Sequence, residues 1–438
     1  MDIRTIQETD TILKRIAWLS GQDNEKSFGS LMHLYNVDSL KQCFLELDGN
    51  KAVGIDGIDK AKYAQDLDRN IADLHKRMKQ MAYIPGTIRQ VLIPKEGGKP
   101  GATRPLGISN IEDKIVQKMT QKILQSIYEP IFMDSSHGFR PGRGCHTCIK
   151  SLMDYLYSNE VQTVIDIDLK NFFGTIDHDL LSEILSLKIR DNKFMRYIKR
   201  MFKAGILGDG ELMITEFGVP QGSIASPILS NIFAHYALDL WINEIIQPHC
   251  KGKVTLFRYA DDAVICCEFE EDARRIRKTL GKRLAKFKLQ LNEEKTKMVS
   301  FDKKKARCGI RQETFDFLGF TIYWGLSRGK RVIPKLKTKS KALKTKLKNV
   351  EHWIKSVRNK LKLRDIWRTF CSKMRGHIQY YGVSHNCATV EKFLHESKRK
   401  VFKWLNRRSQ KKSFNWEKFN LFLERYPLPE VKIVHRLF

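Results

Sequence analysis

The chain has few acidic residues for its length. Among its 438 residues, 49 are Asp or Glu and 79 are Lys or Arg, which gives a formal net charge of +30. A basic excess of this size predicts a polyanionic partner, and nucleic acid is the simplest one. A secreted cationic protein would be the alternative, but the first residues contain no apolar signal segment.

Long apolar runs and paired cysteines are also missing. No stretch is long enough to span a membrane, so we expect no membrane partner and a cytoplasmic location, either bacterial or within an organelle. The nine cysteines are odd in number and scattered, which is typical of reduced thiols. Cys145 and Cys148 have half of the spacing of a zinc site, but no second pair follows. We therefore expect no zinc there.

Two adjacent carboxylates, Asp261 and Asp262, stand between apolar runs in the segment 257–267 and follow Tyr259 and Ala260. The pattern predicts a β-hairpin whose tight turn carries both acids. Adjacent anions repel, so a chain keeps them together where a cation binds. Mg²⁺ suits carboxylate oxygens and leaves positions open for phosphates. A third acid from elsewhere would complete a two-metal site for phosphoryl transfer.

A third acid is available in the strand-like segment 164–168. Asp166 and Asp168 are two residues apart and therefore share one face of a strand, so either could hold metal. Here the chain resembles the reverse transcriptases of the group II intron-encoded maturase type. The resemblance maps the catalytic acid of polymerase motif A to Asp168. It implies two Mg²⁺ ions, with Mn²⁺ as a substitute, held by Asp168, Asp261, Asp262 and Ile167.

The resemblance implies a set of nucleotide contacts. The apolar runs 91–95 and 104–108 predict a β-hairpin. In the family its cations close over the triphosphate, although exposed surface charges would look the same. Phe173 would lie beneath the sugar and exclude a ribose 2′-hydroxyl. The turn 217–227 precedes an apolar helix expected over 228–241. The implied nucleotide-binding residues are Lys95, Arg104, Phe173, Gln221 and Lys295.

A second set of motifs predicts contacts with template and primer. The segment 136–144 is a turn rich in Gly and Pro that opens a helix, and its Arg140 and Arg143 would suit a template backbone. A purely structural turn is the alternative. In the resembled family, Tyr259 supports the primer end, and the strand containing Gly319 contacts the primer. The glycine-rich stretch 51–57 lacks the Gly-Lys-Ser/Thr ending of a phosphate loop.

The composition changes after about residue 327. Apolar residues from Leu343 to Leu361 recur at spacings of three and four, which predicts one helical stripe in a basic surrounding. Its place in the chain suggests a thumb helix that grips a duplex. Farther on, aromatic residues alternate with cations, as in RNA-binding surfaces, and the block resembles the maturase-specific domain. The candidate RNA-binding residues are Arg375, Tyr380, Lys403, Trp404, Arg407 and Arg408.

These motifs predict an α+β right-hand polymerase followed by a helical maturase-type RNA-binding domain. We place the N-terminal extension and fingers in 1–165, the palm in 166–326, the thumb in 327–365 and the RNA-binding domain in 366–438. The expected function is RNA-directed DNA polymerisation. Its partners would be dNTPs, an RNA template with a DNA or RNA primer, and a group II intron-type RNA that the protein helps to splice and copies during intron mobility.

Other functions remain open at the level of sequence. One is a splicing factor that binds its RNA without copying it. Another is a domesticated reverse transcriptase that acts in DNA repair or phage defence, and a polymerase that makes RNA from RNA is more remote. The chain departs from the family at Gly174, where Asp is usual, and shows no HNH nuclease pattern. Both a monomer and a homodimer are compatible with the sequence.

Overall fold

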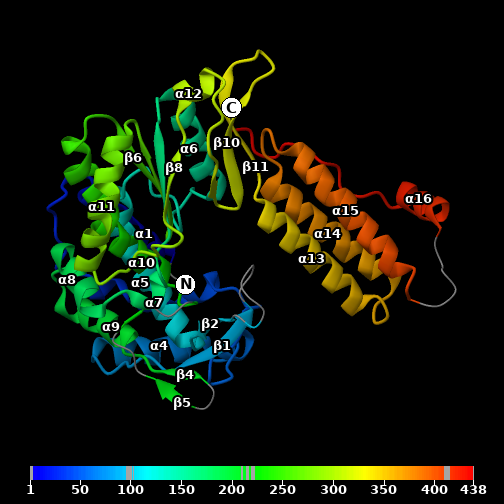
Figure 1. Cartoon of the computed structure of the whole chain (residues 1–438). Helices are drawn as coiled ribbons and strands as arrows, with labels where there is room; N and C mark the ends of the chain where they lie inside the picture. Colours follow the sequence, from blue (N-terminus) through cyan, green and yellow to red (C-terminus); the bar gives the residue numbers. More distant parts are fainter. Residues whose placement is uncertain are drawn as a thin grey trace. The chain divides into compact units, whose positions relative to one another are not determined.

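The structure is a computed structural model that describes residues 3–94, 101, 103–208, 211–213, 217–218, 222–408 and 415–437. Contacts divide the chain into two compact units, coloured along the sequence in Figure 1. Unit 1 comprises Met1–Gly144, Ile167–Ile265 and Glu271–Lys297. Unit 2 comprises Cys145–Asp166, Cys266–Glu270 and Met298–Phe438.

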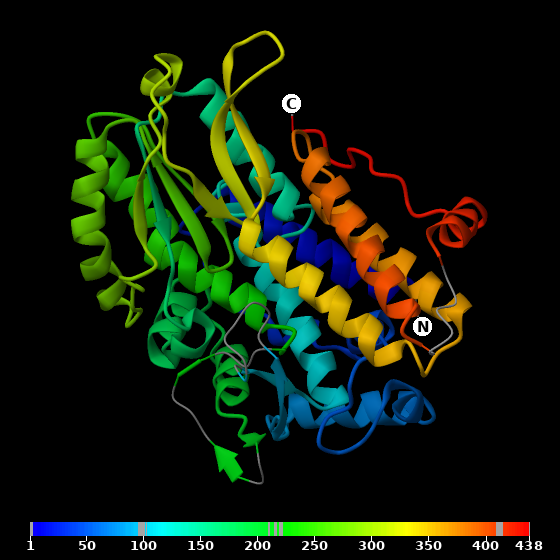
Figure 2. The ribbon, with the colours of Figure 1, turned by 45° about the vertical axis from the view of Figure 1, so that its right-hand side comes forward.

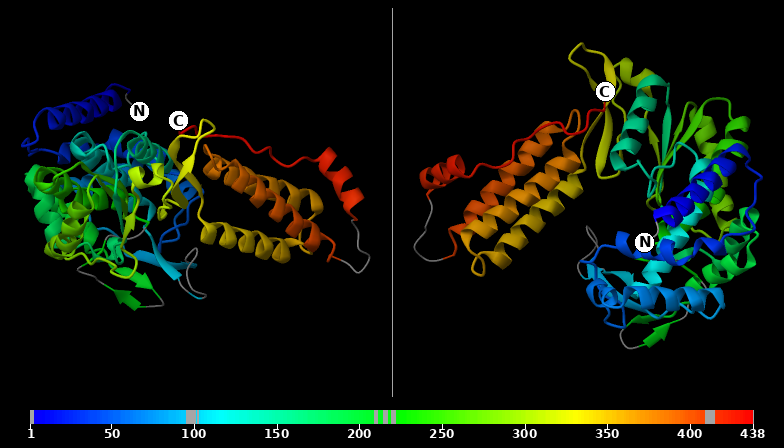
Figure 3. Two further views of the ribbon diagram at one scale, coloured as in Figure 1. Left: turned by 45° about the horizontal axis from the view of Figure 1, so that its top comes forward. Right: turned by 180° about the vertical axis from the view of Figure 1, so that it is seen from behind.

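Helix α5 (Ile111–Tyr128) forms the centre of the helical core of unit 1. Its residues Ile115, Ile123 and Leu124 are fully buried, and α1 (Ile3–Gln22) and α2 (Val37–Glu46) both pack against it. Figure 3 shows α1 in dark blue. The other helices of this region are α3 (Lys60–Ala64), α4 (Leu67–Lys79), α7 (Phe172–Thr175), α8 (His178–Lys188), α9 (Asn192–Phe202), α10 (Ser226–Ala234) and α11 (Glu270–Lys286), with single turns at Met32–Leu34, Glu129–Ile131 and Gln247–His249.

Side-chain caps fix where several of these helices begin. Asp177 accepts a hydrogen bond from the Leu180 amide at the start of α8, and Asp191 accepts bonds from the first amides of α9. Such caps satisfy amides that have no partner within the helix. The apolar helix expected over 228–241 is not uniform. After α10 the chain forms π-helical segments at His235–Asp239 and Trp241–Ile246.

The predicted β-hairpin in the first part of the chain is confirmed. Strands β1 (Ile88–Pro94) and β2 (Thr103–Ile108) pair antiparallel, with Ile93 opposite Arg104. They belong to a sheet with the order β2-β1-β4-β5, in which β4 (Ile206–Gly208) pairs with β1 and β5 (Glu211–Met213) pairs with β4. The tip of the hairpin, including Lys95, lies outside the described residues.

A second sheet carries the predicted acids. Its order is β6-β7-β3-β8, with β6 at Val254–Tyr259, β7 at Asp262–Cys267, β3 at Thr163–Ile167 and β8 at Lys297–Ser300. The turn between β6 and β7 confirms the second predicted hairpin. The Gln162 amide, before β3, donates to the carbonyl of Cys267 at the end of β7, over 3.0 Å. The two strands are therefore antiparallel, and the end of β3 meets the beginning of β7.

Unit 2 contains a bundle of three long helices, α13 (Ser340–Val357), α14 (Leu363–Tyr381) and α15 (Cys387–Leu405), which Figure 2 shows side by side. The predicted apolar stripe lies on α13 from Leu343 to Val357, with Val350 and Ile354 buried, but its last member, Leu361, lies beyond the end of this helix and is exposed. The boundary that we expect between the thumb and the RNA-binding domain, after residue 365, falls inside α14. A division there would cut this bundle. The remaining elements are β9 (Phe315–Phe317), β10 (Phe320–Leu326) and β11 (Val332–Thr338), paired in the order β11-β10-β9, with α6 (Cys145–Ser158), α12 (Lys303–Arg307) and α16 (Trp416–Arg425).

The last segment of unit 2 returns along the bundle after α16, as Figure 3 shows in red. Helix α16 is held by Phe419 and Phe422, whose rings contact the ring of Trp367 on α14. The amide of Val434 then donates to the carbonyl of Gly382 over 2.6 Å. Across the described part of the chain, we find no helix with the length and apolar character needed to cross a membrane.

Candidate active site

Asp261 and Asp262 occupy the turn of the hairpin between β6 and β7. Tyr259 is the last residue of β6 and Asp262 the first of β7, so the turn is tight. Ala260 has a φ of 59°, a left-handed conformation that residues other than glycine rarely adopt. Asp261 is half-buried and Asp262 is exposed. The flanking strand residues are buried on both faces, which holds the two acids at the rim of a rigid sheet.

Asp168 follows β3 directly and is fixed by backbone contacts within unit 1. Its amide donates to the Thr296 hydroxyl over 3.2 Å, and its carbonyl accepts from the Asn292 amide over 2.8 Å. Because β3 is antiparallel to β7, Asp168 lies at the same sheet edge as Asp262. Asp168 and the pair Asp261 and Asp262, which begins 93 positions later in the sequence, therefore stand at the same end of neighbouring strands.

The carboxylate of Asp168 has two polar partners from the segment between α11 and β8. Asn292 donates its side-chain amide to Oδ1 over 2.9 Å. The Nζ atom of Lys295 lies 3.4 Å from Oδ2. The lysine that the resemblance placed near the triphosphate is therefore in contact with the acid of motif A. Asn292 is a site residue that sequence reasoning missed, although it stands three positions before Lys295.

The donors at this edge are suitable for a hard divalent cation. Three carboxylates, with the carbonyl of Ile167 at the end of β3, provide only oxygen ligands, which Mg²⁺ prefers. Within the described ranges, no three His, Cys, Asp or Glu side chains are already close enough together to hold a metal ion. The side chain of Asp168 instead contacts Lys295 and Asn292. An ion bound there would have to share this carboxylate with Lys295 or displace the lysine.

Three aromatic rings form a cluster beside the acid turn. Phe139 lies between the others, with its ring centroid 6.3 Å from that of Phe173 and 6.4 Å from that of Tyr259. Phe139 is 49% exposed, so the cluster presents an apolar surface. Phe173 and Tyr259 were predicted as nucleotide and primer contacts, whereas Phe139 was read only as part of a turn. Its place directly before Arg140 in that turn gave no signal for this contact.

The unusual Gly174 has a steric explanation. A Cβ at this position would lie 2.3 Å from the side-chain nitrogen of Asn171, and the Cβ of Gly218 would lie 3.1 Å from the Cα of Gly174. The turn after motif A therefore packs closely on the start of the segment 217–227, which resembles polymerase motif B and is called motif B below. His178 strengthens this contact with a hydrogen bond to the carbonyl of Gly218, over 2.7 Å. An Asp at 174 would not fit this packing without movement of Asn171.

The guanidinium of Arg140 is bonded within the protein. Arg140 is buried, and its guanidinium donates to the carboxylate of Glu129 and to the carbonyls of Met133 and Ser136. Its donors therefore stabilise the turn itself, and the template contact expected of Arg140 stays a prediction. Arg143 is more exposed and donates to Asp134 over 2.6 Å.

The remaining nucleotide-binding candidates are only partly described. Gln221, like Lys95, lies outside the described residues. Arg104 is exposed on β2. Gly222, the next residue of motif B, has a φ of 111°, and a Cβ there would lie 2.3 Å from the carbonyl oxygen of Gly107. The glycine thus allows motif B to approach the backbone of β2.

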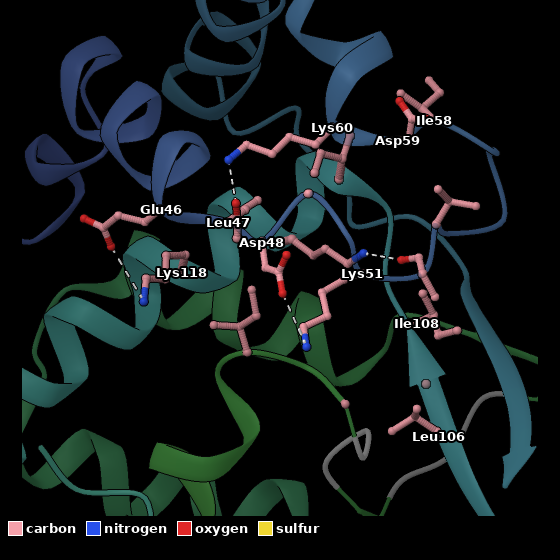
Figure 4. A pocket seen from close by; sticks show the side chains of 18 of the residues that line it. Glu46, Leu47, Asp48, Lys51, Ile58, Asp59, Lys60, Leu106, Ile108 and Lys118 are labelled. Carbon is pink, nitrogen blue, oxygen red and sulfur yellow. Dashed lines mark hydrogen bonds and ion pairs between the residues drawn. The ribbon is translucent and has the colours of Figure 1, made fainter. Parts of the chain in front are cut away.

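A pocket of about 550 Å³ lies in unit 1 beside β2 (Figure 4). Its walls include Val53, Ile58 and Ile108, and its lysines come from the loop after α2, from the start of α3 and from α5. Lys60 donates to the carbonyl of Leu47 over 2.5 Å. Burial lowers the pKa of Lys114, another lining residue. The pocket combines an apolar wall with lysines and with the acids Glu46, Asp48 and Asp59. Residues 51–53, the start of the glycine-rich stretch, thus line a pocket even though the stretch is no phosphate loop.

In unit 2, the predicted RNA-binding residue Trp404 is surrounded by cations. Charged groups of Lys355, Arg358 and Arg407 lie 4.5 to 5.0 Å from its ring centroid, and that of Lys403 lies at 5.8 Å. We call these five residues the Trp404 cluster. They come from α13, from the turn after it and from α15 with its C-terminal turn, so the cluster depends on the bundle. Cations stacked on an indole suit both the phosphates and the bases of RNA.

The other candidate RNA-binding residues in unit 2 differ in their exposure and in their contacts. Arg375 is exposed on α14, and Arg408 donates to the carbonyl of Leu361 over 3.0 Å. Tyr380 is half-buried and its hydroxyl donates to the carbonyl of Leu318. This bond anchors the turn before Gly319, which has a φ of 79°. A positioning role for Tyr380 is therefore better supported by the contacts than direct RNA binding.

Comparison with known proteins agrees with this arrangement. Residues 93–322 match the family described as reverse transcriptase (RNA-dependent DNA polymerase). The group II intron-encoded protein LtrA of Lactococcus lactis subsp. cremoris is 31% identical over 300 residues, which cover 67% of this chain and 48% of LtrA. The protein YkfC of Escherichia coli K12 is 31% identical over 284 residues, covering 58% of this chain and 74% of YkfC.

A third relative comes from a fungus. The uncharacterized 91 kDa protein in the cob intron of Schizosaccharomyces pombe is 39% identical over 180 residues, which cover 41% of this chain and 21% of that protein. The chain therefore spans about half of LtrA, and a smaller share of the fungal protein. The family match covers more than half of the chain and includes all three acids. The chain belongs to the reverse transcriptase family, and its resemblance to group II intron-encoded proteins is confirmed.

Proposed function

We propose that the chain is an RNA-directed DNA polymerase that binds a group II intron-type RNA, assists its splicing and copies it into cDNA. The observation that carries this proposal is that Asp168, just after β3, and Asp262, the first residue of β7, stand at the same end of neighbouring strands, with Asp261 in the adjoining turn. Lys295 and the aromatic cluster of Phe139, Phe173 and Tyr259 lie beside them. These are the groups needed to bind a nucleotide triphosphate and the end of a primer.

The three acids would hold the metal ions. Two Mg²⁺ ions bound there would activate a primer 3′-hydroxyl and neutralise charge on the departing pyrophosphate. The backbone bonds of Asp168 to Thr296 and Asn292 fix its main chain at this end of the sheet. The aromatic cluster would exclude water and support the sugar and the primer end. Lys295 would bring a positive charge, and a proton, to the triphosphate.

Replacing Lys295 by alanine is expected to lower the rate of nucleotide addition about 100-fold, since a positioned proton donor contributes on that order. The apparent affinity for Mg²⁺ should rise, because the ion would no longer compete with the ammonium group 3.4 Å from Asp168. Single-nucleotide addition, measured as a function of dNTP and Mg²⁺ concentration, would separate the two effects.

Lys282→Ala is the matched control for this prediction. Lys282 is exposed on α11, so its loss removes the same charge away from Asp168. Its addition rate and Mg²⁺ dependence should equal those of the wild type. If Lys295→Ala also had the addition rate and Mg²⁺ dependence of the wild type, Lys295 would have no role in the reaction. Its contact with Asp168 would then be only an ion pair of the protein without nucleic acid.

The pocket beside β2 would receive a nucleotide of the template strand. Its wall residues Val53 and Ile108 offer an apolar surface for a base, and Lys51 is exposed at its rim. Gly222 lines the pocket and belongs to motif B, which connects it to the polymerase motifs. Exposed cations next to an apolar wall can bind a phosphate and a base together.

The Trp404 cluster would contact the intron-type RNA. Glu351 is the acid nearest to it, and hydrogen bonding from Lys400 lowers the pKa of this carboxyl to about 2. Replacing Trp404 by leucine should weaken RNA binding about tenfold, the order expected for one lost stacking contact. RNA affinity should be measured by fluorescence anisotropy at several salt concentrations. The salt dependence should remain, since the cations are retained.

Trp18→Leu provides the matched control for Trp404→Leu. Trp18 lies on α1 in unit 1 and is 63% exposed, so the same aromatic group is removed from an exposed position outside the cluster. Its RNA affinity should be unchanged. Equal losses in both variants would mean that the loss at Trp404 is not specific to the cluster, and the assignment would be wrong.

The function is tested by primer extension on an RNA template with a DNA primer, dNTPs and Mg²⁺. Extension by the wild-type protein is expected. Tight RNA binding without extension would instead favour a splicing factor on a polymerase frame. A search for a catalytic intron RNA around the reading frame separates intron mobility from a role in DNA repair or phage defence, because only the first requires such an RNA.

A further inference from the structure

Arg258 is the largest fully buried side chain of unit 1, at 1% exposure, and immediately precedes Tyr259 and the acid turn. Its guanidinium makes five hydrogen bonds. Nε and Nη2 donate to the two carboxylate oxygens of Asp239, over 2.7 and 2.6 Å. Nη1 donates to the side chain of Asn231 over 3.1 Å, and Nη2 also donates to the Ser136 hydroxyl over 2.7 Å. A bidentate pair of this kind fixes the plane of the guanidinium.

The fifth hydrogen bond reaches the acid turn itself. Nη1 of Arg258 donates to the carbonyl of Ala260 over 3.0 Å. Ala260 is the residue with the left-handed φ of 59°, so this bond holds the one strained peptide between Tyr259 and Asp261. The direction of the Asp261 and Asp262 side chains depends on that conformation.

Asp239 reaches Arg258 from a widened part of the helix that follows motif B. It ends the π-helical segment His235–Asp239, in which the Leu240 amide bonds to the carbonyl of His235, five positions earlier. π-Helical segments are rare in proteins, and those that occur often lie at functional sites. Asn231, one element earlier on α10, also donates to the carbonyl of Gly138, over 2.5 Å. The same buried group thus connects three motifs: the helix after motif B, the turn 136–144 and the acid turn.

We propose that Arg258 is a positioning residue for the polymerase site: held by Asp239, Asn231 and Ser136, it fixes the Ala260 carbonyl and thereby aims Asp261 and Asp262 at the metal ions. This inference rests on the proposed function for its reaction, but its geometry does not depend on that function. A buried ion pair alone could be purely structural. The bond to Ala260 is what adds a role at the site.

The test must separate the orientation of the turn from the stability of the fold. Arg258→Met alone would leave the buried Asp239 carboxylate with only His235, 3.8 Å away, as an ionisable partner. The double variant Arg258→Met/Asp239→Leu removes both charges together, a change that proteins often tolerate well. It still loses the bond to Ala260. Three quantities should be measured: amide hydrogen exchange of the peptide 256–264, Mn²⁺ affinity of the protein without nucleic acid, and primer extension as a function of Mg²⁺ concentration.

The double variant is expected to remain folded. The amide exchange rate of the turn should rise, and the Mn²⁺ affinity should fall, each by about tenfold or more. Extension should require more Mg²⁺ and should stay reduced when Mg²⁺ is saturating. Arg200→Met is the matched control, since Arg200 also donates to two carbonyls, those of Met81 and Tyr83, away from the turn. This control should lower thermal stability and leave Mn²⁺ affinity unchanged.

The proposal would be overturned if the folded double variant showed the same exchange rate, Mn²⁺ affinity and primer extension as the wild type. If the double variant does not fold, Ser136→Ala decides, because it removes one partner of Arg258 without a charge. It should give faster exchange of the turn and a higher Mg²⁺ requirement, and unchanged values would again overturn the proposal. Failure of the wild type to extend a primer would contradict the proposed function, while the exchange measurement would still test Arg258.

Discussion

Primer extension should fall by at least about 1,000-fold when Asp261 and Asp262 are both replaced by asparagine, since the change removes two of the three carboxylates that would hold metal. The substitution keeps the size of both side chains and removes only their charge. RNA affinity should stay near the wild-type value, because the Trp404 cluster in unit 2 is untouched. Extension assays and RNA titrations on the same preparations would measure both quantities.

Asp154→Asn is the control for the loss of an acid. Asp154 lies on α6, and its side chain is half exposed and pairs with Lys150. This variant should extend primers at the wild-type rate. If the asparagine pair at 261 and 262 retained substantial extension, the acids at the sheet edge would not be the metal ligands. A loss of RNA binding in that variant would point to general misfolding instead.

Replacing Gly138 by alanine is expected to reduce extension about 100-fold, although this residue carries no functional group. An added Cβ would lie 2.3 Å from the amide nitrogen of Ala260 and 3.0 Å from the carbonyl carbon of Tyr259. Both are backbone atoms, so the acid turn itself must shift. Displacement of a reacting group by about 1 Å can cost a factor of this size. Steady-state extension kinetics and Mn²⁺ affinity should both be measured.

Gly144→Ala tests whether this effect is specific. Gly144 belongs to the same motif, but a Cβ there meets no atom within 4 Å. This variant should retain wild-type extension and wild-type thermal stability. Similar losses for both glycines would show that the whole segment 136–144 is sensitive to substitution, independently of the contact with Ala260.

Local features of the structure were predictable from the sequence because they depend on near neighbours. Alternating apolar residues around Asp261 and Asp262 gave the hairpin of β6 and β7, and the stripe from Leu343 gave α13. The family resemblance mapped Asp168 and Lys295, which the structure brings within 3.4 Å of each other. The π-helical segments after α10 could not be foreseen, because their apolar pattern also fits a regular α-helix.

Arg140, Phe139 and Arg258 show what the sequence left undecided. An arginine in a Gly-rich turn reads as a contact for nucleic acid, yet Arg140 is buried and donates to acceptors within the protein. Phe139 became part of the site only because the turn 136–144 packs beside the acid hairpin. Arg258 looked like one more basic residue among 79, but in the fold it donates five hydrogen bonds to four residues that are distant or near in the chain.

The sequence by itself determined the charge of this protein, its polymerase motifs, the identity of the candidate metal acids and the family to which it belongs. These properties are written in residue types and short spacings. Only the tertiary structure decided which basic side chains lie at the candidate site and which are bonded to acceptors within the protein. It also decided how the turn that carries Asp261 and Asp262 is held. The physical reason is that a hydrogen bond or a buried charge is set by partners distant in the chain, and no local pattern records them.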